Sequence, residues 1–146
     1  MKRRFRLPGR LARECGGSTA IEFALIAPTL MILLLGTIQV GVGMQEYNAL
    51  RGVAGDVARY AVVNYQTNNK VSTSTLETYG SSVARGSPYN LPAEGLLITV
   101  TQPGTQRIAG ATELTVTVRA QVNNILKFVT FNDYYITYSR PIFLLT

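Results

Sequence analysis

Residues 17–44 read GSTAIEFALIAPTLMILLLGTIQVGVGM, and this stretch decides the fold. After Glu22, the 22 residues Phe23–Met44 carry no charge. As an α-helix they would extend for about 33 Å, which is enough to cross a hydrocarbon core of about 30 Å. We therefore predict a membrane-spanning helix over about residues 21–44.

The charge before this run orients it. Residues 1–17 hold six basic side chains against Glu14, a net charge of +5, whereas the rest of the chain has a net charge of +1. Basic residues beside a spanning helix stay in the cytoplasm, so we expect a single membrane pass with the C-terminal head outside, in the periplasm or at the cell surface. The alternative is a secretory signal peptide cut after Gly43, but the apolar run exceeds the usual length of about 7–15 residues.

Composition argues against several other classes of protein. Without the leader the chain has no basic face for phosphates, so we expect no nucleic-acid partner. Cys15 is the only cysteine and there is no histidine, which excludes Ser-His-Asp and Cys-His catalysis and most zinc sites. The acids of the head are scattered singly, and no phosphate-binding loop or calcium loop is present. We predict that the protein is no enzyme and has no metal, cofactor or small-molecule substrate.

The helical pattern continues beyond Met44 but becomes amphipathic. Apolar residues recur at spacings of three and four, namely Tyr47, Leu50, Ala54, Val57, Ala58 and Ala61. We predict one long helix over about residues 18–65, with a break near Gly52 and Gly55 as the alternative, because each glycine costs a helix up to about 1 kcal/mol.

Residues 66–146 are predicted to form a small head. Ser74 and Glu77 match a capping box, which predicts a short helix over Thr75–Ala84. Alternating apolar and polar residues predict strands over Leu96–Thr101, Thr112–Val122 and Tyr134–Ser139, the last ending before Pro141. The apolar stretch Ile125–Phe131 is ambiguous. The predicted fold class is α+β, with a short antiparallel sheet of three strands packed on the amphipathic half of the long helix.

Aromatic residues gather late in the chain: Phe128, Phe131, Tyr134, Tyr135, Tyr138 and Phe143. We interpret them as core and sheet surface, with an adhesive or partner-binding patch as the alternative.

Glu22 is the candidate functional residue. A carboxylate inside a bilayer costs at least about 2.5–3.5 kcal/mol, so such groups usually have a partner. A cut between Gly17 and Ser18 would create an amine that can pair with Glu22 of a neighbouring subunit and set the register between parallel helices. In the simpler interpretation, Glu22 lies near the cytoplasmic interface, reaches water and has no role. Pro28 would bend the helix and Gly36 would permit close helix packing.

The stretch from Gly17 to Phe23 resembles the cleavage signal of type IV pilins and pseudopilins, with glycine before the cut, glutamate fifth after it and then an apolar helix. The wider stretch from Gly17 to Val63 resembles the TadE/TadG-like family of the tight-adherence (Flp) pilus system. The shared features are Ala20-Ile21-Glu22-Phe23-Ala24-Leu25, Pro28, the run through Leu35-Gly36, Asn48-Ala49-Leu50 and Ala58-Arg59-Tyr60-Ala61.

This resemblance implies a pilin-like fold and a minor pilin or pseudopilin of the inner membrane. It implies residues 1–17 as a leader removed by prepilin peptidase, cleavage at Gly17-Ser18, sometimes N-methylation, and helix packing through Phe23, Pro28 and Gly36. The expected partners are the peptidase, other pilins, the pilus assembly platform and membrane lipid, and the expected role is assembly of an adhesive fibre. The alternative is an uncleaved, membrane-anchored binding module.

Overall fold

The computed structural model describes residues 16–124 and 134–145. The chain divides into two compact units, Met1–Thr37 and Ile38–Thr146. The predictions for the leader before residue 16 and for the apolar stretch 125–131 lie outside the described residues.

Helix α1 spans Gly16–Gln66 and belongs to both units. The predicted helix over residues 18–65 is therefore confirmed, and the alternative of a break near Gly52 and Gly55 is wrong. Gly52 lies in close contact with Tyr89: a Cβ built on Gly52 would lie 2.6 Å from the hydroxyl oxygen of Tyr89. Packing of the amphipathic half stabilises the helix where intrinsic propensity is weak.

In the first unit the apolar side chains of α1 point outward. Phe23 is 70% exposed and Leu25 is 74% exposed. Within the described residues, α1 is the one helix long and apolar enough to cross a membrane, and the rest of the chain buries none of its most apolar window. Such a surface is unfavourable in water, and the helix fits a single-pass membrane anchor.

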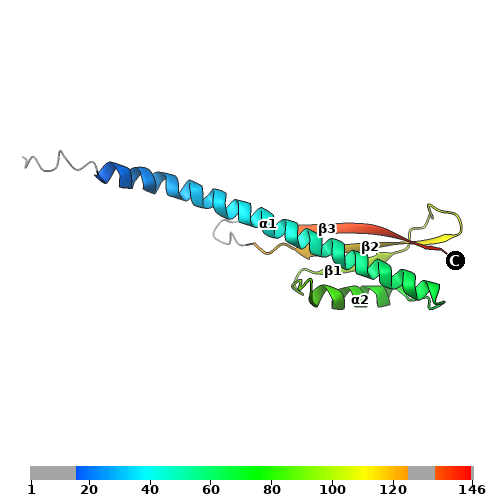
Figure 1. Ribbon diagram of the computed structural model, residues 1–146. Helices are drawn as coiled ribbons and strands as arrows, with labels where there is room; N and C mark the ends of the chain where they lie inside the picture. The colour runs from blue at the N-terminus through cyan, green and yellow to red at the C-terminus, as the bar shows by residue number, and fades with distance from the viewer. Residues whose placement is uncertain (1–15, 125–133, 146) are drawn as a thin grey trace, which may run out of the picture. The chain divides into compact units, whose positions relative to one another are not determined.

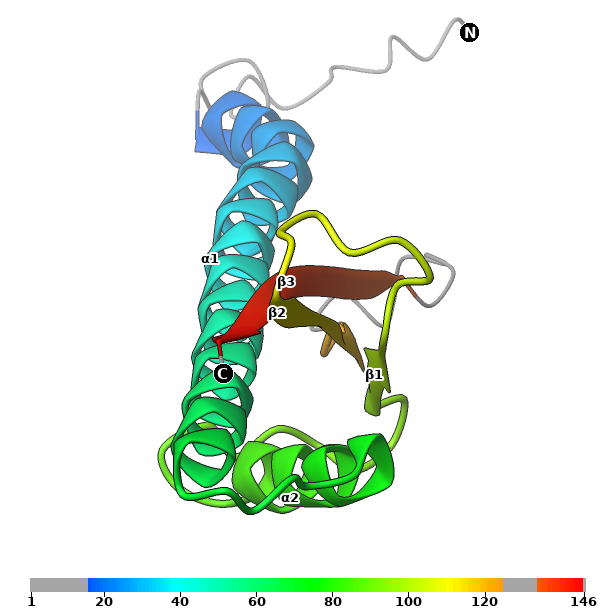
Figure 2. The same ribbon diagram turned by 90° about the vertical axis from the view of Figure 1, so that its right-hand side faces the viewer.

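The second unit contains the sheet and a second helix (Figures 1 and 2). In the described residues the strands are β1 (Leu97–Thr101), β2 (Ala111–Gln121) and β3 (Tyr135–Leu145), in the order β1-β2-β3 with both pairs antiparallel. Figure 1 shows the C-terminal half of α1 and helix α2 (Thr73–Arg85) beside this sheet. The α+β class and the sheet of three antiparallel strands are confirmed.

The core of this unit lies between the sheet and the two helices. The face of α1 that was predicted to be apolar is buried, with Leu50 and Val57 fully inaccessible to solvent. Alternate residues of β1 and β2 face the same core, as strand geometry requires. The buried core residues of the strands are Ile98, Val100, Leu114, Val116, Val118, Ala120, Ile142 and Leu144.

Helix α2 begins two residues earlier than its predicted start. Its N-cap is Ser72, whose hydroxyl accepts a hydrogen bond from the backbone N–H of Thr75 at 3.2 Å. The predicted capping box from Ser74 to Glu77 is therefore wrong. Glu77 instead accepts a hydrogen bond from the backbone N–H of Val100 at 2.8 Å. Its carboxylate therefore bonds to β1 and does not cap α2.

Strand β3 does not end before Pro141, as predicted, but continues to Leu145. Pro141 lies opposite Thr115, and β3 is at the edge of the sheet in the described part of the chain. Proline is tolerated there because an edge strand does not need hydrogen bonds on both sides. Beyond it, Ile142 and Leu144 are buried, and their burial keeps the strand on the sheet.

Candidate functional site

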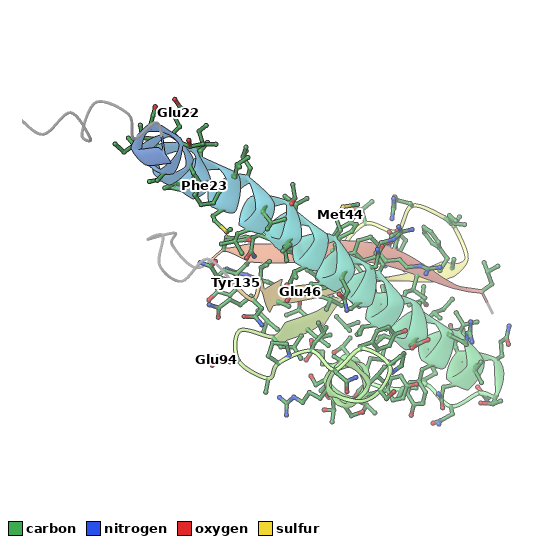
Figure 3. All side chains as sticks on the ribbon, turned by 60° about the vertical axis from the view of Figure 1, so that its left-hand side comes forward. Glu22, Phe23, Met44, Glu46, Glu94 and Tyr135 are labelled. Carbon is green, nitrogen blue, oxygen red and sulfur yellow. The ribbon has the colours of Figure 1, made fainter. Side chains whose placement is uncertain are left out.

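The first candidate site is the N-terminal end of α1. The hydroxyl of Ser18 donates a hydrogen bond to Oε1 of Glu22 at 3.2 Å. Residues four apart on a helix lie on the same face, which explains the contact. In Figure 3, Glu22 and Phe23 project from the N-terminal turns of α1, and both side chains are exposed.

The predicted packing residues lie further along the same unit. Pro28 is inside the helix, where it cannot donate to the carbonyl of Ala24. A Cβ built on Gly36 would meet nothing within 4 Å. Gly36 thus leaves a surface notch that a neighbouring helix could enter. The roles of Gly17, Ser18, Glu22, Phe23, Pro28 and Gly36 in processing and assembly stay predictions.

The second candidate site was missed by sequence reasoning. Gln39, inside the predicted membrane span, is only 9% exposed. Its Nε2 donates to the backbone carbonyl of Asn123 at 3.0 Å and to the hydroxyl of Tyr134 at 2.9 Å. A glutamine inside an apolar run was the available signal, because a buried amide needs hydrogen-bond partners.

Glu46, two turns further along α1, bonds to the backbone of the same residue, Asn123. Its Oε1 accepts the backbone N–H of Asn123 at 3.2 Å. Its Oε2 is buried and has no hydrogen-bond partner within residues 16–124 and 134–145. Gln39 and Glu46 together hold both polar groups of the Asn123 backbone, so the end of β2 is fixed against the helix. A groove of about 600 Å³ beside Glu46 is lined also by Val42, Asn48, Pro88 and Leu91.

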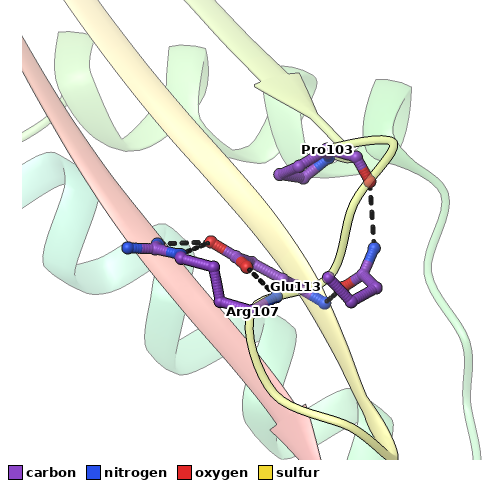
Figure 4. Close-up of polar contacts among 4 residues, drawn as sticks. Pro103, Arg107 and Glu113 are labelled. Carbon is purple, nitrogen blue, oxygen red and sulfur yellow. Dashed lines mark hydrogen bonds and ion pairs between the residues drawn. The ribbon is translucent and has the colours of Figure 1, made fainter.

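A third polar cluster closes the hairpin between β1 and β2 (Figure 4). Glu113 is 2% exposed and pairs with the guanidinium of Arg107, whose Nε lies 2.7 Å from Oε1. The backbone N–H of Arg107 donates to Oε2 at 3.2 Å. The hydrogen bonds from Arg107 hold the pKa of Glu113 below its usual value, although burial opposes this. This carboxylate is used by the fold and is closed to a substrate.

The connector after α2 is tied to α1 by Tyr89. Its hydroxyl donates to Oδ2 of Asp56 at 2.9 Å. Burial and then the hydrogen bond to Asp56 raise the pKa of Tyr89. Within the described residues, no three His, Cys, Asp or Glu side chains lie close enough to hold a metal ion.

These features define an α+β protein with a long apolar N-terminal helix and a small head that packs on the second half of that helix. The TadE-like protein family matches residues 17–59, which confirms the resemblance seen in the sequence and identifies this segment as TadE-like. The matched segment contains Ser18, Glu22 and Gln39, and it ends before α2 and the sheet. No curated protein and no solved structure matches the chain.

Proposed function

We propose that this protein is a minor pilin or pseudopilin that assists assembly of a Flp-type tight-adherence pilus. The observation that carries the proposal is the TadE-like match over residues 17–59 together with a carboxylate, Glu22, at the start of an apolar helix. Most of the exposed surface of that helix is apolar, which is the surface needed to move from lipid into a bundle of similar helices.

In this proposal the chain first enters the inner membrane with its basic leader in the cytoplasm. Prepilin peptidase then hydrolyses the amide bond between Gly17 and Ser18, which leaves a carboxylate on Gly17 and an amine on Ser18. The hydrogen bond between Ser18 and Glu22 supports the idea that residue 18 and this carboxylate are within reach of each other.

The new amine has two potential acceptors. It can pair with Glu22 of its own helix or with Glu22 of an adjacent subunit. The pairing between subunits fixes the axial register of neighbouring helices, and we assign it to the assembled state. In the isolated protein in the membrane, the pairing within one chain compensates the carboxylate until a neighbour arrives.

The mature N-terminus tests the proposal. Purified membranes from cells that express the peptidase should yield a chain that begins at Ser18 when analysed by intact-mass spectrometry. Cells without the peptidase should yield the chain beginning at Met1 and serve as the control. An intact Met1 in both strains would contradict processing and leave the anchored binding module as the better interpretation.

The groove beside Glu46 favours the second candidate function, that of a membrane-anchored binding module. Its lining is largely uncharged, and Glu46 offers a buried carboxylate atom without a hydrogen bond in the described part of the chain. An uncleaved membrane-anchored head could use this groove to hold a cationic side chain of a partner. In that case Glu46→Gln would abolish partner binding, whereas Glu22→Gln would leave it intact.

A further inference from the structure

The contacts of Gln39 limit how far lipid can cover α1. Residues 39–44 end the uncharged run, but they belong to the same compact unit as the head. Because Gln39 is bound to Asn123 and Tyr134, the end of the sheet lies beside this part of the helix. A bilayer that reached Met44 would also have to immerse that end of the head.

Three strand ends meet at this place. Leu97 pairs with Arg119 at the start of β1, and Arg119 pairs with Thr137 near the start of β3. The exposed fractions are 55% for Leu97, 41% for Tyr134 and 43% for Tyr135. The guanidinium of Arg119 lies over the ring of Tyr135, 4.1 Å from its centroid. We call Leu97, Arg119, Tyr134 and Tyr135 the tyrosine end of the sheet.

We propose that the tyrosine end of the sheet is a lipid-binding surface that sits in the headgroup region on the outer side of the membrane. Tyrosine is enriched at membrane interfaces because its ring is apolar and its hydroxyl is polar. A guanidinium binds phosphate well, and Leu97 adds apolar area. The hydrogen bond from Gln39 to Tyr134 places this surface beside the last residues of the uncharged run, where a spanning helix leaves the hydrocarbon.

Charge indicates which lipid this surface takes. Glu94 precedes Gly95, where a built Cβ would lie 3.3 Å from Cε1 of Tyr135, and Figure 3 shows Glu94 and Tyr135 at the same end of the head. Among the described residues, Arg119 and Glu94 offset each other, and Glu46 bonds to the Asn123 backbone with its Oε2 buried. Zwitterionic phosphatidylcholine headgroups should therefore suffice for binding, without anionic lipid.

If the tyrosine end lies in the headgroup region, the expected membrane span of α1 also shifts. A hydrocarbon core needs about 20 helical residues, and counting back from Ile38 ends at Thr19. The span would then be about residues 19–38 instead of 21–44. Glu22 would lie about 4.5 Å inside the inner boundary at the helical rise, where its need for a charged partner is greater. This inference rests on the membrane anchorage proposed above, but not on pilus assembly.

Tryptophan fluorescence tests the inference, because the chain contains no tryptophan. The full chain with Tyr135→Trp is reconstituted into phosphatidylcholine vesicles in which the lipids carry bromine close to the headgroup. We expect blue-shifted emission and strong quenching. The control is Tyr65→Trp, because residue 65 lies about 39 Å beyond Gln39 along α1 by the helical rise, and this variant should not be quenched.

Flotation of the vesicles tests the membrane anchorage separately from the lipid-binding surface. If the Tyr135→Trp chain floats with the vesicles while its emission is unquenched, the lipid-binding surface is overturned and the anchorage is left intact. Equal quenching of Tyr135→Trp and Tyr65→Trp would also overturn the surface. A chain that fails to float would overturn the anchorage, the proposed function and this inference together.

Discussion

The side-chain amide of Gln39 donates a hydrogen bond of 2.9 Å to the hydroxyl of Tyr134, a residue 95 positions later in the chain. The same nitrogen bonds to the carbonyl of Asn123. A residue in the uncharged run thus holds the ends of β2 and β3. The head is therefore fastened to the helix on the side that faces the membrane in our proposal.

Gln39→Leu should destabilise the head even though it makes the helix more apolar. The variant leaves the Asn123 carbonyl and the Tyr134 hydroxyl without this part-buried donor, and loss of a typical hydrogen bond costs about 0.5–1.5 kcal/mol. Denaturant unfolding of the detergent-solubilised protein, monitored by circular dichroism, measures the change in the free energy of unfolding. Thr37→Leu is the matched control, because Thr37 is exposed and bonds only within its helix, to Leu34, among the described residues. Equal stability of the two variants would contradict the fastening role of Gln39.

Glu22→Gln should leave membrane insertion intact and reduce fibre assembly. The amide keeps the size and hydrogen-bonding capacity of the side chain but removes the charge that pairs with the Ser18 amine. Loss of about 1.4 kcal/mol at a subunit contact already lowers association tenfold, and fibre yield by electron microscopy measures the effect.

Ser18→Ala distinguishes the serine hydroxyl from the terminal amine. It removes the hydrogen bond to Glu22 seen in the structure but retains the amine that cleavage creates. Assembly should therefore be close to normal if cleavage proceeds. An assembly defect as large as that of Glu22→Gln, in a chain cleaved normally, would assign the loss of assembly to the hydroxyl. It would contradict the charge-pairing role of Glu22.

The Arg107–Glu113 pair predicts acid sensitivity of the head. The pKa of folded Glu113 is lowered, so its contribution to stability is present above the unfolded glutamate pKa of about 4.3. This contribution is lost as the pH falls through the lower pKa of the folded state. Glu113→Gln should be less stable than the wild type at neutral pH, and the difference should narrow in acid. Thermal unfolding curves at a series of pH values test this, and parallel pH dependences in the two proteins would count against it.

Gly52→Ala should destabilise the protein although alanine is the better helix former. The added methyl would lie 2.6 Å from the hydroxyl oxygen of Tyr89, and such overpacking costs about 1–3 kcal/mol, more than the gain of up to about 1 kcal/mol in helix propensity. Gly55→Ala is the control, because its methyl would meet Arg140 at an ordinary 3.6 Å. Thermal unfolding should rank Gly55→Ala at or above the wild type and Gly52→Ala below it.

Local patterns were sufficient for most of the elements. The apolar run and the spacing of Leu50, Val57 and Ala61 predicted α1, and alternation predicted the strands, because these signals depend on neighbours within one or two turns. The errors occurred where distant residues compete. Glu77 bonds to Val100 of β1 instead of capping α2, and burial of Ile142 and Leu144 carries β3 past Pro141.

The sequence by itself determined the membrane-length helix, the α+β class, and the candidate cleavage and charge-pairing residues at the start of the helix. Each follows from composition and short-range periodicity. Only the tertiary structure decided that Gln39 and Glu46 hold Asn123 and that Leu97, Arg119 and Tyr135 meet at one end of the sheet. Strand pairing and side-chain packing bring together residues tens of positions apart, and no local pattern encodes that register.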